Sequence, residues 1–326
     1  MSTAPFAEFP AIDLGRWRSG TGDERDAVAA EVDHALRHTG FMLLTGHGID
    51  FDLPARVREL CRTFFHFDTA TKQPYRSTPG FPGWQPTGVE ANAYASGQES
   101  PPDLKETLNF GPAGERPIMV STVGPIQCTN VFPAEVPDMA AAIGEYTTAA
   151  GQVAAELFEL LAEAIGAPEG TFTDSCGAAL HSLSVTWYPS RATTGEPDAG
   201  QYRIGPHTDF GTITLLDREP GVSGLQVQTL AGDWVDAPFV PGSLTINIGD
   251  LMARWSGDRW RSNMHRVLAP STAAPAEELI SLVLFVEADL EAVITPLPPP
   301  IGGGGDYEPV SALQYLVDKL NAISVG

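Results

Sequence analysis

The chain has 326 residues, 43% of them hydrophobic and 9% aromatic, which is typical of a globular protein with a sizeable buried core. The 41 Asp and Glu residues outnumber the 19 Lys and Arg residues, and the formal net charge is −22. Such a surface repels nucleic-acid phosphates and anionic membranes, so we exclude both as expected partners. Nothing in the composition indicates an oligomeric state.

The cysteines and the N-terminal residues predict the compartment. Cys61, Cys128 and Cys176 show no C-x-x-C spacing, which indicates free thiols in a reducing environment. The first residues lack a basic segment followed by a long apolar run. No stretch approaches the roughly 18 consecutive apolar residues that a membrane span requires. We therefore expect a soluble, cytoplasmic protein.

The first third of the chain predicts short strands that alternate with helices. Apolar periodicity indicates a strand at 9–14, a helix at about 20–38, a strand at 41–44 and a helix from about residue 53. Residues 74–102 are rich in turn residues and predict an irregular loop that lines or covers a pocket. Regular structure resumes at 103–110.

The rest of the chain predicts one long helix followed by a β-rich region. Apolar residues recur at helical spacing over 137–165. After Gly166, short β-prone runs separated by turn residues are typical of a sandwich or barrel. These runs are 183–188, 212–216, 224–228, 234–237, 243–248, 264–269 and 279–287. A Pro- and Gly-rich linker at 296–309 precedes a final helix that Ser311 caps.

His207 and Asp209 lie two residues apart in the β-prone segment GPHTDFGTITLL. Side chains two apart on a strand point to the same face. His265, in NMHRVLAP, is the candidate third ligand. Two imidazoles and one carboxylate with open positions opposite them form the facial triad of non-haem Fe(II) oxygenases. An isolated H-x-D pair is also compatible with a structural hydrogen bond, so the surrounding motifs decide the interpretation.

These motifs resemble the isopenicillin-N-synthase-like family of Fe(II)- and 2-oxoglutarate-dependent oxygenases over nearly the whole chain. The first half contains FPAIDL, GFMLLTGHGI, FFHFDTATK and DLKETLNFG. The second half contains VTWYP, HTDFGTITLL, GLQVQTLAGDWVDAPFVPGSLTINIGDLMARWSGDRWRSNMHRV and ISLVLF. The resemblance implies a mainly β chain with α elements (α+β), whose core is a double-stranded β-helix (jelly roll) flanked by helices.

The resemblance also implies how the chain is divided and what it does. Residues 1–120 would form an N-terminal region, 121–295 the jelly-roll core with its long helix and iron site, and 296–326 a linker and helix, within one compact unit. The implied enzyme is a dioxygenase that uses Fe(II), 2-oxoglutarate and O2. His207, Asp209 and His265 would bind the Fe(II). It would hydroxylate, desaturate or cyclise a small organic substrate in secondary metabolism, and Asp209 disfavours halogenation. No catalytic residue beyond the metal ligands is expected.

One position departs from the family pattern. The family's Arg-x-Ser, whose arginine pairs with the distal carboxylate of 2-oxoglutarate, is represented by Leu279, Ile280 and Ser281. Hydrogen bonds to charged groups contribute roughly 1.5–3 kcal/mol each, so the change predicts weaker cosubstrate binding. Three explanations stay open: a substitute cation, with Arg203 and Arg191 as candidates, an iron oxidase of the isopenicillin N synthase type that does not use 2-oxoglutarate, or an impaired variant. A non-catalytic small-molecule binding protein is a further alternative.

Other residues are assigned to the cosubstrate and the substrate. The resemblance implies that Tyr188 and Ser281 hydrogen-bond the distal carboxylate of 2-oxoglutarate. Phe210 lies beside the metal ligands in sequence, and the irregular loop contributes further aromatic side chains. The candidates for an apolar substrate pocket are Phe210, Phe81, Trp84 and Tyr94.

Overall fold

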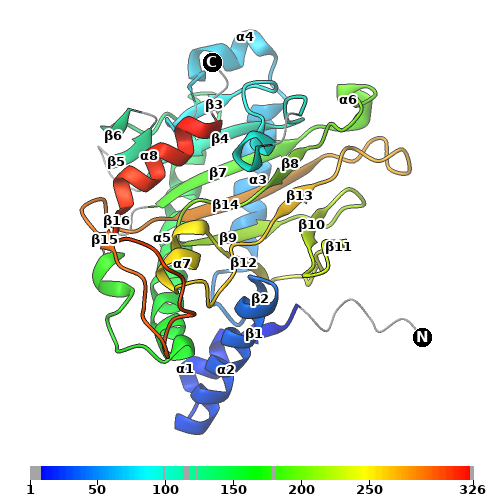
Figure 1. The fold of residues 1–326 in the computed structure, drawn as a ribbon. Helices are drawn as coiled ribbons and strands as arrows, with labels where there is room; N and C mark the ends of the chain where they lie inside the picture. The colour runs from blue at the N-terminus through cyan, green and yellow to red at the C-terminus, as the bar shows by residue number, and fades with distance from the viewer. Residues whose placement is uncertain are drawn as a thin grey trace.

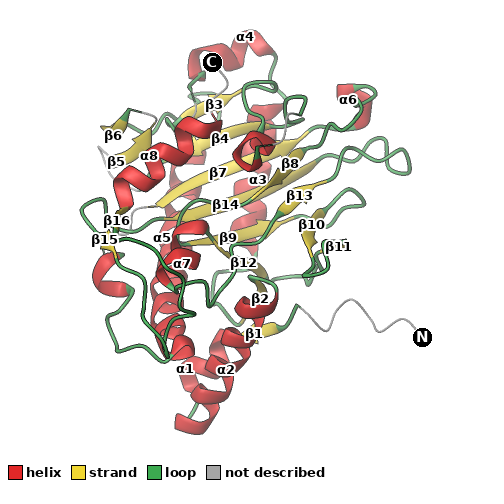
Figure 2. Cartoon of the chain, in the orientation of Figure 1, coloured by secondary structure: helices red, strands yellow, loops and turns green. Residues whose placement is uncertain are grey.

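The computed structural model describes residues 9–78, 80–97, 100–112, 118–121, 123–177 and 181–323. Two β-sheets lie face to face, and helices cover the outer face of the larger one (Figures 1 and 2). This arrangement confirms the predicted jelly roll flanked by helices. Within the described part of the chain, no helix combines the length and hydropathy needed to cross a bilayer.

The larger sheet has eight strands and the smaller one four. In spatial order, the larger sheet consists of β1 (Ala11–Asp13), β2 (Phe41–Thr45), β12 (Leu244–Ile248), β9 (Ile213–Arg218), β14 (Leu279–Val286), β7 (His181–Tyr188), β4 (Glu106–Phe110) and β3 (Gly83–Gln85). The smaller sheet consists of β11 (Trp234–Asp236), β10 (Leu225–Gln228), β13 (His265–Val267) and β8 (Ile204–His207). Two further pairs are β5 (Ile118–Ser121) with β6 (Gly124–Gln127) and β15 (Val293–Ile294) with β16 (Val310–Ser311).

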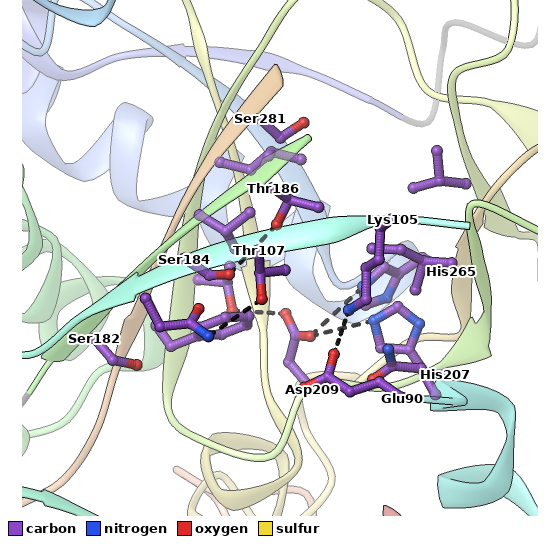
Figure 3. Close-up of a pocket in the computed structure, with 18 of the residues that line it drawn as sticks. Glu90, Lys105, Thr107, Ser182, Ser184, Thr186, His207, Asp209, His265 and Ser281 are labelled. Carbon is purple, nitrogen blue, oxygen red and sulfur yellow. Dashed lines mark hydrogen bonds and ion pairs between the residues drawn. The ribbon is translucent and has the colours of Figure 1, made fainter. Parts of the chain in front are cut away.

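Strand β7 shows how the sequence gives the larger sheet one apolar and one polar face. Leu183 and Val185 are fully buried in the main apolar core, against the helices. The alternate residues Ser182, Ser184 and Thr186 point into the space between the sheets (Figure 3). Period-two alternation therefore gives the barrel a polar inner wall on this strand.

The helices fill the outer layer. They are α1 (Leu14–Ser19), α2 (Gly22–His38), α3 (Asp52–Phe65), α4 (Thr69–Lys72), α5 (Met139–Ile165), α6 (Arg191–Thr194), α7 (Asp250–Trp255) and α8 (Ala312–Ile323), with short 3-10 turns at Gln73–Tyr75, Asn92–Ser96 and Thr173–Ser175. Tyr146 and Leu157 of α5 are 0% exposed and share the core with Leu284 of β14. Burial of each such side chain contributes about 1.5–3 kcal/mol, so α5 anchors the sheet.

Most predicted elements agree with the structure, and three differences lie around the site. All seven predicted β-prone runs are strands, and the long helix is α5. However, β8 ends at His207, so Asp209 lies beyond the strand. Residues 250–255, for which no element was predicted, form α7, and the irregular loop contains β3. The division at residues 120 and 295 stays a prediction, because β1 to β4 of the first segment complete the larger sheet.

Candidate metal centre and adjoining cavity

Three side chains converge where the two sheets approach each other. His207 ends β8 and His265 begins β13, and these two residues are direct partners in the antiparallel register. Both imidazoles therefore project from the same face, with ring centroids 4.2 Å apart. Their Nε2 atoms lie 3.7 and 3.6 Å from Oδ1 of Asp209 (Figure 3). One ligand atom of each residue falls within 4.8 Å of the others, close enough to share one metal ion.

Backbone carbonyls orient both imidazoles. Nδ1 of His207 lies 2.8 Å from the carbonyl oxygen of Gly205, and Nδ1 of His265 lies 3.1 Å from that of Asn263. A ring nitrogen beside a carbonyl must carry the proton and donate it, which leaves the Nε2 lone pair directed at the centre. Each ring is therefore held in the tautomer that a metal ligand requires.

The carboxylate is oriented by a pair of side chains that are cross-strand neighbours. Thr214 on β9 and Asn247 on β12 are partners in the register. Thr214 Oγ1 donates to Oδ2 of Asp209 at 2.6 Å, and Asn247 Nδ2 donates to the same oxygen at 2.7 Å. Oδ1 is thus left to face the two imidazoles. The sequence analysis did not identify this role of Asn247, because it depends on the pairing of β12 with β9.

Two of the three candidate ligands, His207 and Asp209, are in the protonation states that a divalent cation needs. Burial, together with the neighbouring His265, lowers the pKa of His207 to about 3, so this ring is neutral. Burial opposes ionisation of Asp209, but the two histidines and the hydrogen bonds from Asn247 and Thr214 hold its pKa below the usual range. Metal binding therefore requires no proton to be removed from either group near neutral pH.

The three ligands lie in the wall of a cavity of about 260 Å³ between the sheets. One wall is polar and is formed by Ser182, Ser184 and Thr186 on β7 with Thr107 and Asn109 on β4. The remaining wall is largely apolar. Its side chains include Phe41, Phe81, Phe210, Leu216, Val267 and Leu316.

The residues predicted to bind the cosubstrate divide into two groups. Tyr188, Ser281 and Leu279 line the cavity, and burial raises the pKa of the Tyr188 hydroxyl. Arg203 and Arg191 are outside the lining. The guanidinium of Arg203 is 0% exposed and lies 3.2 Å from Glu277 Oε1, and that of Arg191 pairs with Glu196. Neither arginine reaches the cavity, because each is held by a carboxylate elsewhere.

Of the four residues predicted to bind the substrate, two line the cavity and two do not. Phe210 and Phe81 line the cavity. Trp84 is 2% exposed in the main core, and its Nε1 donates to Glu106 at 2.6 Å. Tyr94 is 39% exposed, and neither Trp84 nor Tyr94 belongs to the lining.

The cavity also contains charged side chains that the sequence analysis missed. Lys105 Nζ lies 2.7 Å from Glu90 Oε2, so these two residues neutralise each other. Burial and the nearby Asp209 raise the pKa of Glu287 to about 7. Arg218 is the last residue of β9 and belongs to the lining. Counting in twos from Thr214 along β9 was the signal that could have identified Arg218.

Comparisons with known proteins identify the family. Residues 9–135 match the model described as non-haem dioxygenase in morphine synthesis N-terminal, and residues 179–287 match the 2OG-Fe(II) oxygenase superfamily. The chain is 41% identical to Validamycin A dioxygenase of Streptomyces hygroscopicus subsp. limoneus, over 95% of this chain and 85% of that protein. It is 30% identical to the 2-oxoglutarate-dependent dioxygenase caaD of Aspergillus niger, over 91% of this chain and 89% of that one.

Solved structures agree with this relationship. A full-length Neurospora crassa protein, solved in complex with alpha-KG and 5-formyluracil, superposes with a TM-score of 0.80 at 25% identity, covering 96% of each chain. A putative 2OG-Fe(II) oxygenase family protein from Caulobacter crescentus shares the fold with a TM-score of 0.78 at 22% identity, over 96% of this chain and 98% of that one. The ligand chemistry of the His207, Asp209 and His265 cluster is compatible with these relatives. The chain therefore belongs to the superfamily of 2-oxoglutarate- and Fe(II)-dependent oxygenases and is a dioxygenase that acts on small molecules.

Proposed function

We propose that His207, Asp209 and His265 bind the Fe(II), and that 2-oxoglutarate and the substrate occupy the cavity beside them. The observation that carries this proposal is the convergence of three ligand atoms within 4.8 Å of one another. The remaining ring nitrogens and the second carboxylate oxygen are already hydrogen-bonded to the protein. Outer contacts of this kind fix the direction of metal ligands.

The bound iron would supply the oxidising chemistry together with 2-oxoglutarate and O2. The chain's own residues would hold one C–H bond of the substrate beside the metal and limit the access of water. The reaction would be a hydroxylation, a desaturation or a ring closure. The excess of 41 acidic over 19 basic residues supports a free small molecule as substrate, in preference to one carried on nucleic acid.

We further propose that the substrate carries several hydroxyl groups or other hydrogen-bonding groups. Ser182, Ser184 and Thr186 recur every second residue along β7, and Thr107 and Asn109 stand beside them on β4. Hydroxyl and amide groups both donate and accept hydrogen bonds. Some of these groups already bond one another, as Asn109 Nδ2 donates to Thr107 Oγ1 at 3.2 Å and the hydroxyls of Ser184 and Thr186 lie 3.4 Å apart. A hydrocarbon pressed against this wall would leave their remaining donors and acceptors unused. The name of the 41% identical relative makes validamycin A the first compound to test.

The iron assignment is tested by anaerobic Fe(II) titration of the purified protein, with and without 2-oxoglutarate. We expect one Fe(II) per chain and a weak visible charge-transfer band when 2-oxoglutarate is added. Asp209→Ala should lose both signals. Iron binding that survives in Asp209→Ala would contradict the ligand assignment.

The substrate proposal is tested by O2 consumption and product mass with validamycin A and with apolar compounds of similar size. Ser184→Ala should raise KM for a hydroxyl-rich substrate about fivefold or more. Thr63→Ala, which removes an exposed hydroxyl on α3, serves as the matched control. A preference for apolar compounds would overturn the proposal, and substrate oxidation without 2-oxoglutarate would support the oxidase alternative that Leu279 raised.

A further inference from the structure

2-Oxoglutarate carries a carboxylate at each end, and only one end can chelate the iron. The distal carboxylate needs a cation or strong hydrogen-bond donors when it enters a cavity that excludes water. Leu279 occupies the position of the family's arginine and offers neither. Its cavity neighbours Tyr188 and Ser281 supply hydroxyl groups but no charge. The balancing charge must therefore come from another strand.

We infer that Arg218 is the cation that binds the distal carboxylate of 2-oxoglutarate, so that the charge has moved from β14 to β9. This inference rests on the proposed function, since it requires the cosubstrate to bind in this cavity. Arg218 and Ser281 stand directly opposite each other in the antiparallel pairing of β9 and β14. Opposite residues have Cβ atoms about 4.5–5.5 Å apart on one face of the sheet.

Strand alternation supports the same direction for the Arg218 side chain. Thr214 and Leu216 both line the cavity, and Arg218 continues this face at the end of the strand. Thr214 orients Asp209, and Arg218 lies roughly 14 Å further along β9 at about 3.4 Å per residue. An arginine side chain and a five-carbon dicarboxylate chelated to the iron can span this distance between them.

Arg218 is charged but has no carboxylate partner among the residues that the structure describes. Its Nη2 donates to the carbonyl oxygens of Ala237 at 3.0 Å and Pro238 at 2.5 Å. Its Nε is buried without a hydrogen-bond acceptor. The two carbonyls orient the guanidinium without neutralising it, and burial lowers the pKa of Arg218. A partly buried guanidinium that lacks a carboxylate partner is suited to bind an anion.

The acidic residues that flank Arg218 in the chain are bound elsewhere. Asp217 pairs with Arg58, and Glu219 Oε1 lies 2.8 Å from Arg62 Nη2, with both arginines on α3. Glu219 also accepts a hydrogen bond from the backbone of Ile280 at 2.7 Å. Asp217 and Glu219 are therefore both paired with arginines of α3. Arg218, which lies between them in the chain, has no carboxylate partner among the described residues.

The other cations near the cavity have partners. Lys105 lines the cavity, but its Nζ lies 2.7 Å from Glu90. Arg203 is paired with Glu277 and Arg191 with Glu196. A cation that already faces a carboxylate has less to gain from a second one. Lys105 is the competitor that an experiment must separate from Arg218.

The test compares two keto acids that differ only at the distal end. Iron-loaded, anaerobic protein is titrated with 2-oxoglutarate and with 2-oxobutanoate, which lacks the distal carboxylate, and the visible charge-transfer band is followed. Arg218→Gln should raise the dissociation constant of 2-oxoglutarate at least about tenfold and leave those of 2-oxobutanoate and Fe(II) within about twofold. Lys105→Met is the control, and it should not remove the preference for 2-oxoglutarate.

Each outcome decides something. An unchanged preference for 2-oxoglutarate in Arg218→Gln, or its loss in Lys105→Met alone, would overturn the inference. A wild-type protein that binds iron but gives no band with either keto acid would refute the proposed function instead. If Arg218→Gln does not fold, Arg218→Lys keeps the charge but loses the forked donor geometry. It should then weaken 2-oxoglutarate binding selectively, by less than tenfold, and equal affinities in Arg218→Lys and wild type would overturn the inference.

Discussion

The two regions of the cavity wall, around Asp209 and around Ser281, differ in how strictly ligand binding fixes the positions of their residues. At the metal region, three side chains must turn one atom each toward a single point, and each is held there by hydrogen bonds behind it. At the Ser281 region, a carboxylate needs only positive charge and donors within reach. Neighbouring strands about 4.8 Å apart offer equivalent positions for that charge. The lesson is that metal geometry restricts residue positions more strongly than charge balance does.

The largest expected effect comes from removing one of the three candidate metal ligands, where the positions of the side chains are most restricted. Asp209→Ala or His207→Ala should abolish turnover and lower Fe(II) affinity by more than about 100-fold, since two ligands cannot replace three. Metal content after gel filtration and O2 consumption with 2-oxoglutarate measure both effects. His38→Ala, which alters an exposed histidine of α2, is the matched control. Near-normal iron content in Asp209→Ala would show that Asp209 is not a metal ligand.

The next test concerns the residues that hold the carboxylate of Asp209. Asn247→Ala should lower Fe(II) affinity about 10- to 100-fold, because loss of an outer hydrogen bond lets the carboxylate rotate. Titration of Fe(II) with a competing chelator gives the affinity. Thr214→Ser, which keeps the hydroxyl that donates to Asp209, should remain within about threefold of the wild type. Equal losses in both variants would point to general destabilisation.

A third test asks whether the cation near Ser281 can be placed on either of the two strands, by returning the arginine from position 218 on β9 to position 279 on β14. In the double variant Arg218→Gln with Leu279→Arg, the affinity for 2-oxoglutarate should recover to within about tenfold of the wild type. Leu279→Arg alone should not tighten binding, because two guanidinium groups would then repel each other near one carboxylate. Charge-transfer titrations of all three variants give the affinities. A double variant as weak as Arg218→Gln would mean that the two strand positions are not equivalent.

The smallest expected effect is a pH-dependent one at Glu287. Its pKa of about 7 lies above the ordinary 4.5, so ionisation costs stability in the folded state. The destabilisation is absent below pH 4.5, grows as the pH rises, and is complete above pH 7. In metal-free protein, Glu287→Gln should gain about 1 kcal/mol over the wild type between pH 5 and pH 6. Urea denaturation at both values measures this gain, and a constant difference would contradict the raised pKa.

The sequence by itself predicted most of the elements and the three candidate ligands. Period-two runs identified β7 and β9 to β14, helical periodicity identified α5, and the motifs around His207 and His265 identified the candidate metal site, whose three side chains the structure brings together. These features depend on residues that are close in the chain, or on a ligand set whose geometry leaves little choice of residue type. The family resemblance assigned Tyr188 and Ser281 to the distal carboxylate of 2-oxoglutarate, and both residues line the cavity.

Only the tertiary structure decided which arginine side chains are paired with a carboxylate and which are not. Arg203 was a reasonable candidate by its position before His207, but Glu277, 74 residues away, binds it. Arg218 had no distinguishing motif, and its opposition to Ser281 depends on the register of β9 against β14. Likewise, Asn247 meets Asp209 only because β12 pairs with β9. Pairing of buried charges is a long-range electrostatic property, so it is established when strands and helices pack and cannot be determined from local sequence.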